Sequence, residues 1–470
     1  MKFQPLALIL GLLLACAASA APATQPVSFS RDIRPILATN CNACHKPDKM
    51  KADLDMTTFA TLMIGGKHGK TIVPRNPDDS RLVDMISGDD PEMPKDNDSL
   101  KPDEVALIAR WVREGAIDDT PLPGTAKIDP PIYNVSPAIT SMAFSPDGSL
   151  LAVAGYHEVL LHKSDGSGLV GRLIGDCARI ESLAFSKDGK YLAVAGGSPA
   201  EFGQVQVWDV ATRRPYRTFQ PSTDSLFGVS FSPDGKSVAC GAADKIVRRI
   251  NVEDGKVLME FKAHADWVLA TTFSSDGKQL VSGGRDKALK LIDVESGRFV
   301  DDINNPLEQV LCMARHPTED KIIYGGDLGT ARIYRISDNQ GRTAGRNDTN
   351  LLATFERQRG PVYAVAFSPT GDRVALASAG EVRVYDAGNT EPVKPVSMKR
   401  KGARAAQQPV VVQSNAQLIL SAHAGAIFAV AWKPDGSVIA TAGADGMVRF
   451  FDAKTGAPVK EFVPVPITGN

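Results

Sequence analysis

The 470-residue chain has almost no net charge, few cysteines and, beyond its first residues, no long apolar run. A formal net charge of −1 argues against a general affinity for nucleic acid. Six cysteines are few, and Cys177, Cys240 and Cys312 are too scattered for a disulfide framework. Beyond the N-terminus no segment approaches the roughly 18 apolar residues of a membrane-spanning helix, so we expect no transmembrane span. What the chain does have is 43% hydrophobic residues and a length that predicts two or more domains.

Residues 1–20 have the pattern of a secretory signal peptide. Lys2 precedes an apolar run from Phe3 to Leu14, and Ala18-Ser19-Ala20 matches a small-residue cleavage site. The run is too short to span a membrane. The alternative is a lipoprotein signal with Cys16 as the lipidated residue, which fits the residues less well. We therefore expect a protein that is periplasmic or otherwise exported.

The most informative motif is Cys-Asn-Ala-Cys-His at residues 41–45. Two thiols separated by two residues, with an imidazole directly after them, is the spacing that attaches a c-type haem. In that interpretation Cys41 and Cys44 add to the two vinyl groups and His45 ligates the iron. The other interpretations are a thioredoxin-like redox pair, half of a zinc site, or chance. A redox pair lies in a strand-and-helix pattern and zinc needs a second ligand pair, and neither accompanies the motif. We predict one covalently bound haem c.

Helical patterns lie on both sides of this motif. Before it, Ile33, Ile36 and Leu37 form one apolar face, with Ser30 placed as a cap. After it, a helix is expected to begin at Pro102 and to stop at Gly115. One helix before the haem and one after it is the usual arrangement of a small cytochrome. We expect an all-α cytochrome domain over residues 28–120.

Met93 is the predicted sixth ligand of the iron. It precedes Pro94 just upstream of the last helix, where a proline-stiffened loop can hold a thioether over the open face of the iron. His68, in a glycine-rich loop, is the rival ligand. Methionine with histidine gives a higher potential than two imidazoles, which suits the passing of single electrons. The remaining methionines of this region are expected to be core residues: Met50, Met56, Met63 and Met85.

The stretch from Ser30 to Ala116 resembles the cytochrome c domain called the planctomycete type. The matching pieces lie at residues 34–37, 41–45, 52–55, 65–66, 72–74, 77–82, 92–94 and 111–116. The resemblance implies a single haem with Met93 as its distal ligand. The chain departs from the family after Pro94, where Lys95-Asp96-Asn97 replaces the usual proline and glycine, so we expect a different exposure of the haem rim there.

From about Ser136 onward the chain repeats one turn, and a period in the forties is the mark of a repeat fold. The turns lie at 144–148, 185–189, 231–235, 273–277, 315–319, 367–371 and 432–436. Short alternating strands flank each turn, and a later strand often ends in an aromatic residue and aspartate, as at Trp208-Asp209. The pattern is similar to WD40 repeats. Seven units imply an all-β, seven-bladed propeller over residues 136–466, after a linker at 121–135.

Two histidines of the repeats are expected to be structural. His264 precedes Asp286 by 22 residues, and His423 precedes Asp445 by the same interval. In WD40 repeats these positions form a buried hydrogen-bonded network, in which the histidine and the aspartate satisfy each other. We prefer this interpretation to metal or haem binding.

Two insertions interrupt the repeats, at 337–350 and 388–415. The larger is basic, because Lys394, Lys399, Arg400, Lys401 and Arg404 face only Glu391. This 394–404 segment is either a solvated loop or an arm that docks an acidic surface of a partner or of this chain's own haem domain.

Together these patterns predict an exported monohaem cytochrome in periplasmic electron transfer, with the propeller as docking platform for a redox protein. One alternative is an oxidoreductase with a second cofactor in the propeller, and another is a haem-based sensing module. The propeller supplies no recognisable nucleophile, acid/base pair or metal cluster. We therefore expect an electron-transfer protein rather than a catalyst, and assign no enzymatic activity.

Overall fold

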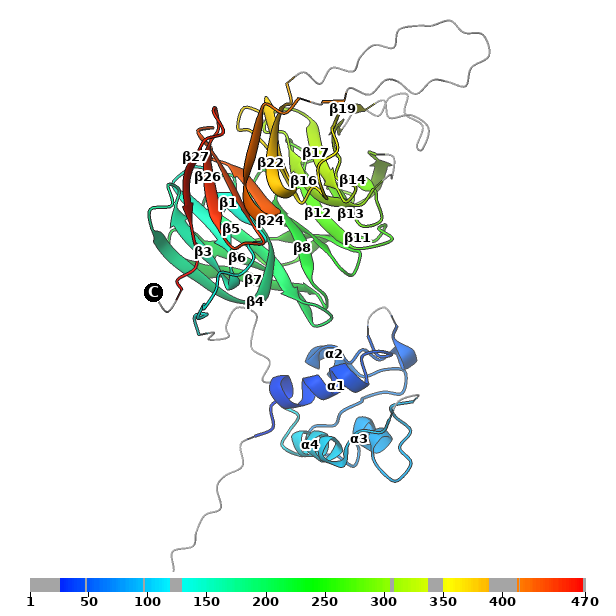
Figure 1. The fold of residues 1–470 in the computed structure, drawn as a ribbon. Coiled ribbons are helices and arrows are strands. Elements are labelled where there is room, and N and C mark those ends of the chain that lie inside the picture. The colour runs from blue at the N-terminus through cyan, green and yellow to red at the C-terminus, as the bar shows by residue number, and fades with distance from the viewer. Residues whose placement is uncertain are drawn as a thin grey trace, which may run out of the picture. The chain divides into compact units, whose positions relative to one another are not determined.

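The computed structural model describes residues 26–46, 49–95, 98–118, 129–304, 308–336, 350–388, 412–413 and 415–467. The chain divides into two compact units, Met1–Pro121 and Leu122–Asn470. The first unit is helical and the second consists of curled β-sheets (Figure 1). The predicted signal peptide with Cys16, most of the two insertions, the 394–404 segment and residues 119–128 of the linker region lie outside the described residues.

Within the described ranges, no helix combines the length and the apolar character that a membrane crossing requires.

The helical segments of the first unit are short. They are a π-helical turn at Phe29–Ile33, α1 (Arg34–Asn40), a 3₁₀ turn at Lys51–Asp53, α2 (Phe59–Ile64), α3 (Arg81–Ile86) and α4 (Pro102–Arg113). The helix predicted to precede the motif is present, but its first turn, Phe29–Ile33, is π-helical and α1 follows it. Its N-cap is Ser28, not Ser30. The Ser28 hydroxyl accepts the N–H of Arg31 at 3.0 Å. The helix predicted after the motif is confirmed as α4, and Gly115 follows it with a φ of 116°.

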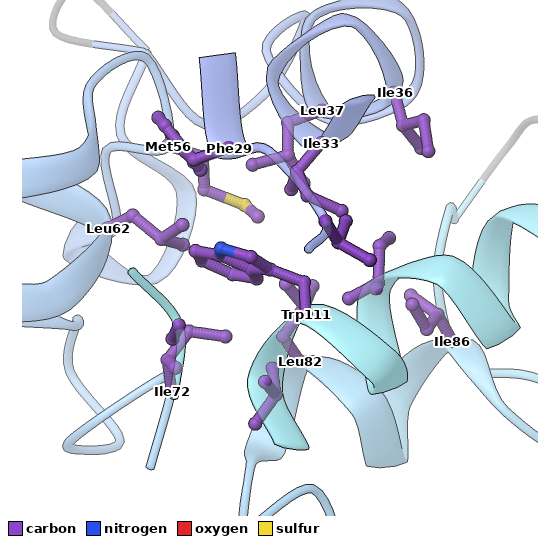
Figure 2. Close-up of a cluster of buried hydrophobic side chains, with 14 of the residues drawn as sticks. Phe29, Ile33, Ile36, Leu37, Met56, Leu62, Ile72, Leu82, Ile86 and Trp111 are labelled. Atoms are coloured by element: carbon purple, nitrogen blue, oxygen red, sulfur yellow. The ribbon is translucent and has the colours of Figure 1, made fainter. Parts of the chain in front are cut away.

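Trp111 of α4 lies within the core of the first unit (Figure 2). Its ring centroid is 5.3 Å from that of Phe29, which in turn packs edge-on against Phe59 at 5.2 Å. The indole N–H, buried with the ring, donates to the carbonyl of Ile117 at 3.2 Å. All the buried members of this core lie between Val27 and Ala116, so the first unit supplies its own core.

The second unit contains five sheets in the described residues. The first has the order β1 (Met142–Phe144), β2 (Leu150–Ala154), β3 (Tyr156–Lys163), β4 (Leu169–Phe185), β5 (Tyr191–Ser198), β6 (Phe202–Asp209) and β7 (Arg214–Ser222). The next two are β8 (Leu226–Phe231), β9 (Ser237–Ala242), β10 (Val247–Asn251) and β11 (Val257–Phe261), then β12 (Val268–Phe273), β13 (Gln279–Gly284), β14 (Leu289–Asp293) and β15 (Phe299–Asp302). The fourth is β16 (Val310–Arg315), β17 (Lys321–Gly326), β18 (Ala331–Arg335), β19 (Leu351–Phe355) and β23 (Val412–Gln413). The fifth is β20 (Ala364–Phe367), β21 (Arg373–Ala377), β22 (Ala379–Asp386), β24 (Leu418–Trp432), β25 (Val438–Gly443), β26 (Val448–Asp452) and β27 (Pro458–Phe462).

The long strands β4 and β24 each serve two groups of strands. The first half of β4 pairs with β3 and its second half pairs with β5. In the same way β24 pairs first with β22 and then with β25. Each long strand is therefore the last member of one group of four antiparallel strands and the first member of the next.

The repeated turn is built by one serine and one aspartate. In the first copy the Ser145 hydroxyl donates to Asp147 at 2.5 Å, and Asp147 accepts the N–H of Ser149 at 3.1 Å. Gly148 has a φ of 70°, a left-handed conformation that glycine adopts without a Cβ clash. The same contact recurs between Ser186 and Asp188 at 2.6 Å. The serine, aspartate and glycine of the repeated motif thus serve to form the turn.

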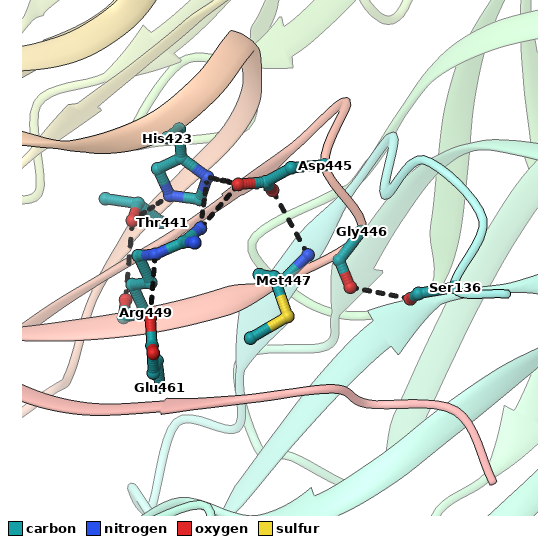
Figure 3. Close-up of polar contacts among 8 residues, drawn as sticks. All are labelled: Ser136, His423, Thr441, Asp445, Gly446, Met447, Arg449 and Glu461. Atoms are coloured by element: carbon teal, nitrogen blue, oxygen red, sulfur yellow. Dashed lines mark hydrogen bonds and ion pairs between the residues drawn. The ribbon is translucent and has the colours of Figure 1, made fainter. Parts of the chain in front are cut away.

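The histidine networks are structural, as predicted. His264 contacts Asp286 at 2.9 Å and Ser282 at 2.8 Å through its two ring nitrogens. His423 contacts Asp445 at 3.0 Å and Thr441 at 2.7 Å (Figure 3).

Residues at the end of the predicted linker pack against the second unit. The Tyr133 hydroxyl donates to the buried carboxylate of Glu158 at 2.8 Å, and Arg172 donates to the carbonyl of Pro131 at 2.8 Å. Tyr133 also forms a parallel bridge with Ile467 near the other end of the unit. The chain is therefore attached to the sheets from about Pro131 onward.

Candidate functional site

A cavity of about 370 Å³ lies in the first unit. Cys41, Cys44, His45 and Met93, the four residues predicted to hold a haem, all line it. The rival ligand His68 borders the same cavity. The fold therefore brings together residues that are far apart in the sequence.

The Cys-x-x-Cys-His motif continues the end of α1 as a further helical turn. The Cys41 N–H donates to the carbonyl of Leu37 at 2.8 Å, and the His45 N–H donates to the carbonyl of Cys41 at 3.1 Å. Both cysteines are half-buried. Burial raises the pKa of the Cys41 thiol to about 11, so this sulfur stays protonated at neutral pH. A reactive redox cysteine has the opposite property, a lowered pKa.

His45 is oriented by the loop that follows it. Its Nδ1 lies 3.0 Å from the carbonyl oxygen of Lys51. Because a carbonyl only accepts, Nδ1 carries the proton and Nε2 keeps a free lone pair. Such a hydrogen bond fixes the ring and the tautomer of a metal-ligating histidine.

Met93 is positioned through its backbone. Its N–H donates to the carbonyl of Met85 at 2.9 Å, which attaches the Met93 loop to the last turn of α3. The side chain packs partly against the core of the first unit. Of the segment in which the chain departs from the resembled family, Lys95 lines the cavity, whereas Asp96 and Asn97 lie outside the described residues.

Two of the four methionines expected in the core lie elsewhere. Met50 is 49% exposed, and Met85 lines the cavity. Met56 is buried and Met63 packs against the core, as predicted. On α3, Leu82, Met85 and Ile86 share one face, and the tertiary structure turns that face toward the cavity.

The loop of His68 is attached to the segment beside the His45 acceptor. The Lys67 N–H donates to the carbonyl of Ala52 at 2.7 Å, next to Lys51. Gly66 is packed tightly there, because a Cβ at this position would lie 2.5 Å from the same carbonyl. The His68 side chain itself is exposed.

The chemistry of the cavity wall fits a haem. Most of the wall is apolar, and among the residues that the structure describes its charged side chains are three cations, Lys51, Arg81 and Lys95, and the carboxylate of Glu92. A haem is a flat apolar ring with two carboxylates, so it needs an apolar wall with an excess of cations. Across the described ranges, no three His, Cys, Asp or Glu side chains gather where they could hold a metal ion.

Family models match both parts of the chain. The family "Planctomycete cytochrome C" matches residues 41–97, which include all four predicted haem-binding residues. The family "WD domain, G-beta repeat" matches residues 132–161, 213–250, 255–293, 349–386 and 414–452. The two longest segments between these matches, 162–212 and 294–348, contain the predicted turns at 185–189 and 315–319. Their described residues include strands of the same kind, β4–β6 and β15–β18.

Curated relatives are similar to parts of the chain. WD repeat-containing protein 1 of Gallus gallus is 29% identical over 158 residues, which cover 30% of this chain and 21% of the relative. Periodic tryptophan protein 2 of Arabidopsis thaliana is 24% identical over 259 residues, 55% of this chain and 25% of the relative. U3 small nucleolar RNA-associated protein 4 homolog of Homo sapiens is 22% identical over 148 residues, 32% of this chain and 18% of the relative. The matched region thus spans about a quarter or less of each relative's own length.

Proposed function

We propose that this chain, a cytochrome-like domain fused to WD40 repeats, is an exported electron-transfer protein that holds one covalent haem c and docks a redox partner on its repeats. The observation that carries the proposal is the cavity, which gathers two cysteines, a histidine with an available Nε2 and a methionine. The signal-peptide pattern of residues 1–20 supports export.

Each residue has one role in this proposal. Cys41 and Cys44 form the thioether bonds, His45 ligates the iron through Nε2, and Met93 supplies the sulfur ligand. When bound, the haem supplies a one-electron couple, with a potential that methionine ligation raises. The apolar wall excludes water, and the Lys51 carbonyl holds the imidazole at a fixed orientation.

The repeats are proposed to form a closed seven-bladed propeller. The strands β1, β4, β8, β12, β16, β20 and β24 each contact the next in this order, and β24 also contacts β1. Side chains of the first and last groups share one hydrophobic cluster, which includes Phe144, Val153, Ala440 and Phe450. The Ser136 hydroxyl donates to the carbonyl of Gly446 at 2.6 Å across the same junction (Figure 3). Such closure protects the sheet edges.

The proposed docking platform is the end of the propeller where the innermost strands begin. Just before β12, Trp267 is 38% exposed, stacks on Phe227 of β8 at 5.4 Å, and carries the Arg285 guanidinium at 4.6 Å over its ring. Near the start of β20, Tyr363 packs edge-on against Phe428 at 5.3 Å. Rigid, partly exposed aromatic side chains of this kind are enriched at protein interfaces.

The haem assignment is tested by purifying the exported protein and extracting it with acidified solvent. We expect the haem to stay with the protein, to appear as one haem in the intact mass, and to become extractable when Cys41 and Cys44 are both replaced by alanine. Asn42→Ala is the matched control, because it alters the same motif and leaves both thiols. Colourless protein, or haem that leaves the unaltered chain, would refute the proposal.

Carbon monoxide binding to the ferrous protein would favour the sensing function, since a firmly held Met93 resists displacement.

A further inference from the structure

Arg81, the first residue of α3, is held on the cavity wall by the residues on either side of it. Ser80 is fully buried, and its hydroxyl accepts the N–H of Val73 at 2.8 Å and donates to the carbonyl of Asn76 at 2.8 Å. The Leu82 N–H donates to the carbonyl of Thr71 at 3.0 Å. The backbone of Arg81 is therefore fixed, and Thr71 is attached to the same stretch.

The Arg81 and Thr71 side chains both line the cavity without a polar partner in the part of the chain that the structure describes. Thr71 is only 6% exposed, and a buried hydroxyl ordinarily makes a hydrogen bond. The Arg81 side chain is exposed, so without a ligand its guanidinium is hydrated, and its donors are free for a ligand of the cavity. The two cavity side chains thus offer donors that no described protein group uses.

We propose that Arg81 and Thr71 bind one propionate carboxylate of the haem. The inference rests on the proposed function, since it presupposes the haem. A guanidinium presents parallel N–H donors that match a carboxylate, and the threonine hydroxyl adds one more. Lys51 and Lys95 also line the cavity, but each is a point charge on a flexible stem and lacks this fork.

Pairing of the propionate with the Arg81 guanidinium should raise the reduction potential of the haem. Without the guanidinium, the negative charge of the propionate is uncompensated beside the iron, and this charge stabilises the ferric state over the ferrous state. Loss of Arg81 therefore lowers the reduction potential. It also changes the bending vibration of the propionate that the guanidinium had restrained.

The test compares haem-loaded, full-length variants by resonance Raman spectroscopy and redox titration. In Arg81→Leu we expect a shifted propionate bending mode and a lower potential, and in Thr71→Val a smaller shift of the same mode. Arg81→Lys keeps the positive charge but lacks the parallel N–H donors of the guanidinium. The propionate bending mode should therefore shift, while the reduction potential stays near that of the unaltered protein. Arg113→Leu is the control, because it removes an exposed cation of the same unit that does not line the cavity.

The outcomes separate this inference from the proposed function. Unaltered protein without covalent haem would overturn both. Haem-loaded Arg81→Leu and Thr71→Val with the propionate modes and potential of the unaltered protein would overturn the propionate assignment alone. Equal shifts in Arg113→Leu would overturn it as well, because the effect would then be one of general charge.

Discussion

The ring of His45 is oriented by a hydrogen bond of its own, whereas the hydrogen bond that positions Met93 comes from its backbone. The Lys51 carbonyl holds Nδ1 of His45 at 3.0 Å, so the ring direction is set before any ligand arrives. Met93 is held through its N–H to the Met85 carbonyl at 2.9 Å, and its thioether remains an unbranched, flexible group. Met56 and Met85 line the same cavity, so the structure offers further methionine sulfurs that the sequence pattern assigned to the core.

At this scale the informative substitution is Met93→Ala. Loss of the sulfur ligand should shift the visible spectrum toward high-spin iron and lower the reduction potential, because methionine ligation raises it. The measurements are absorption spectroscopy and redox titration. Met50→Ala is the control, since Met50 is 49% exposed and does not line the cavity. An unchanged low-spin spectrum in Met93→Ala would assign the ligand role to another residue of the cavity wall, His68, Met85 or Met56.

At the scale of strands, a basic residue recurs on the third strand of five groups, opposite the fourth residue of the second strand. Each of these residues pairs with an acid. Arg248 pairs with Asp244 at 2.7 Å, Lys290 with Asp302 at 3.0 Å, and Arg332 with Glu308. Arg383 pairs with Glu356 at 2.8 Å and Arg449 with Asp445 at 2.6 Å. The histidine–aspartate pairs of two repeats were predicted from the sequence, whereas these five ion pairs were not. The interval of 42 residues from 248 to 290 and again to 332 was the signal that could have revealed it.

Arg449 allows a comparison of two carboxylates on one guanidinium. Asp445 is 13% exposed, contacts His423 and accepts the Met447 N–H at 3.2 Å, whereas Glu461 is 64% exposed. Asp445→Ala leaves several polar groups unsatisfied and should lower the free energy of unfolding by about 1–3 kcal/mol. Glu461→Ala should lower it by less than about 1 kcal/mol, because exposed ion pairs contribute little. Denaturant unfolding of both variants measures the difference, and equal losses would contradict the role given to burial.

At the scale of the whole molecule, the two units have separate cores. The buried cluster of the first unit lies entirely between Val27 and Ala116, and the clusters of the second unit begin at Tyr133. Among the described residues each unit thus has a buried core of its own, so we expect each unit to fold by itself.

A chain that ends after Asp118 should therefore keep the haem spectrum of the full protein. Visible absorption and far-ultraviolet circular dichroism would show an unchanged haem and a helical fold. Loss of haem or helix on truncation would mean that the repeats take part in the folding of the first unit.

Three histidines make the repeats sensitive to acid. Burial lowers the pKa of His162, His316 and His423 below the ordinary value, mainly by desolvating the charged ring. Above about pH 6.5 the rings are neutral in both states, so their contribution to stability is complete. As the pH falls below this value the unfolded chain binds more protons, and each such proton lowers the free energy of unfolding by about 1.4 kcal/mol per pH unit.

Thermal unfolding of the repeats should consequently occur at a lower temperature at about pH 5.5 than at about pH 7.5. The melting temperature should change less with pH in His162→Gln, because glutamine cannot be protonated. Glutamine can still donate to the Pro464 carbonyl, which His162 contacts at 2.9 Å. A melting temperature that does not change over this range would contradict the prediction.

The amino-acid sequence by itself determined the features that are local in the chain. The Cys-x-x-Cys-His motif occupies five consecutive residues, and each repeat turn depends on a serine, an aspartate and a glycine within a few positions. Hydrogen bonding and backbone geometry over such short spans are nearly independent of the rest of the fold. The helices α1 and α4 were predicted from the local sequence pattern for the same reason.

Only the tertiary structure decided which distant side chains meet. His68, Thr71, Arg81, Met85 and Met93 line one cavity because α3 is bonded to the segment at Thr71 and the Met93 loop is bonded to α3. The contact between β1 and β24 likewise joins residues near opposite ends of the second unit. Packing free energy depends on which surfaces are brought together, and apolar spacing shows that a face is buried without showing against what.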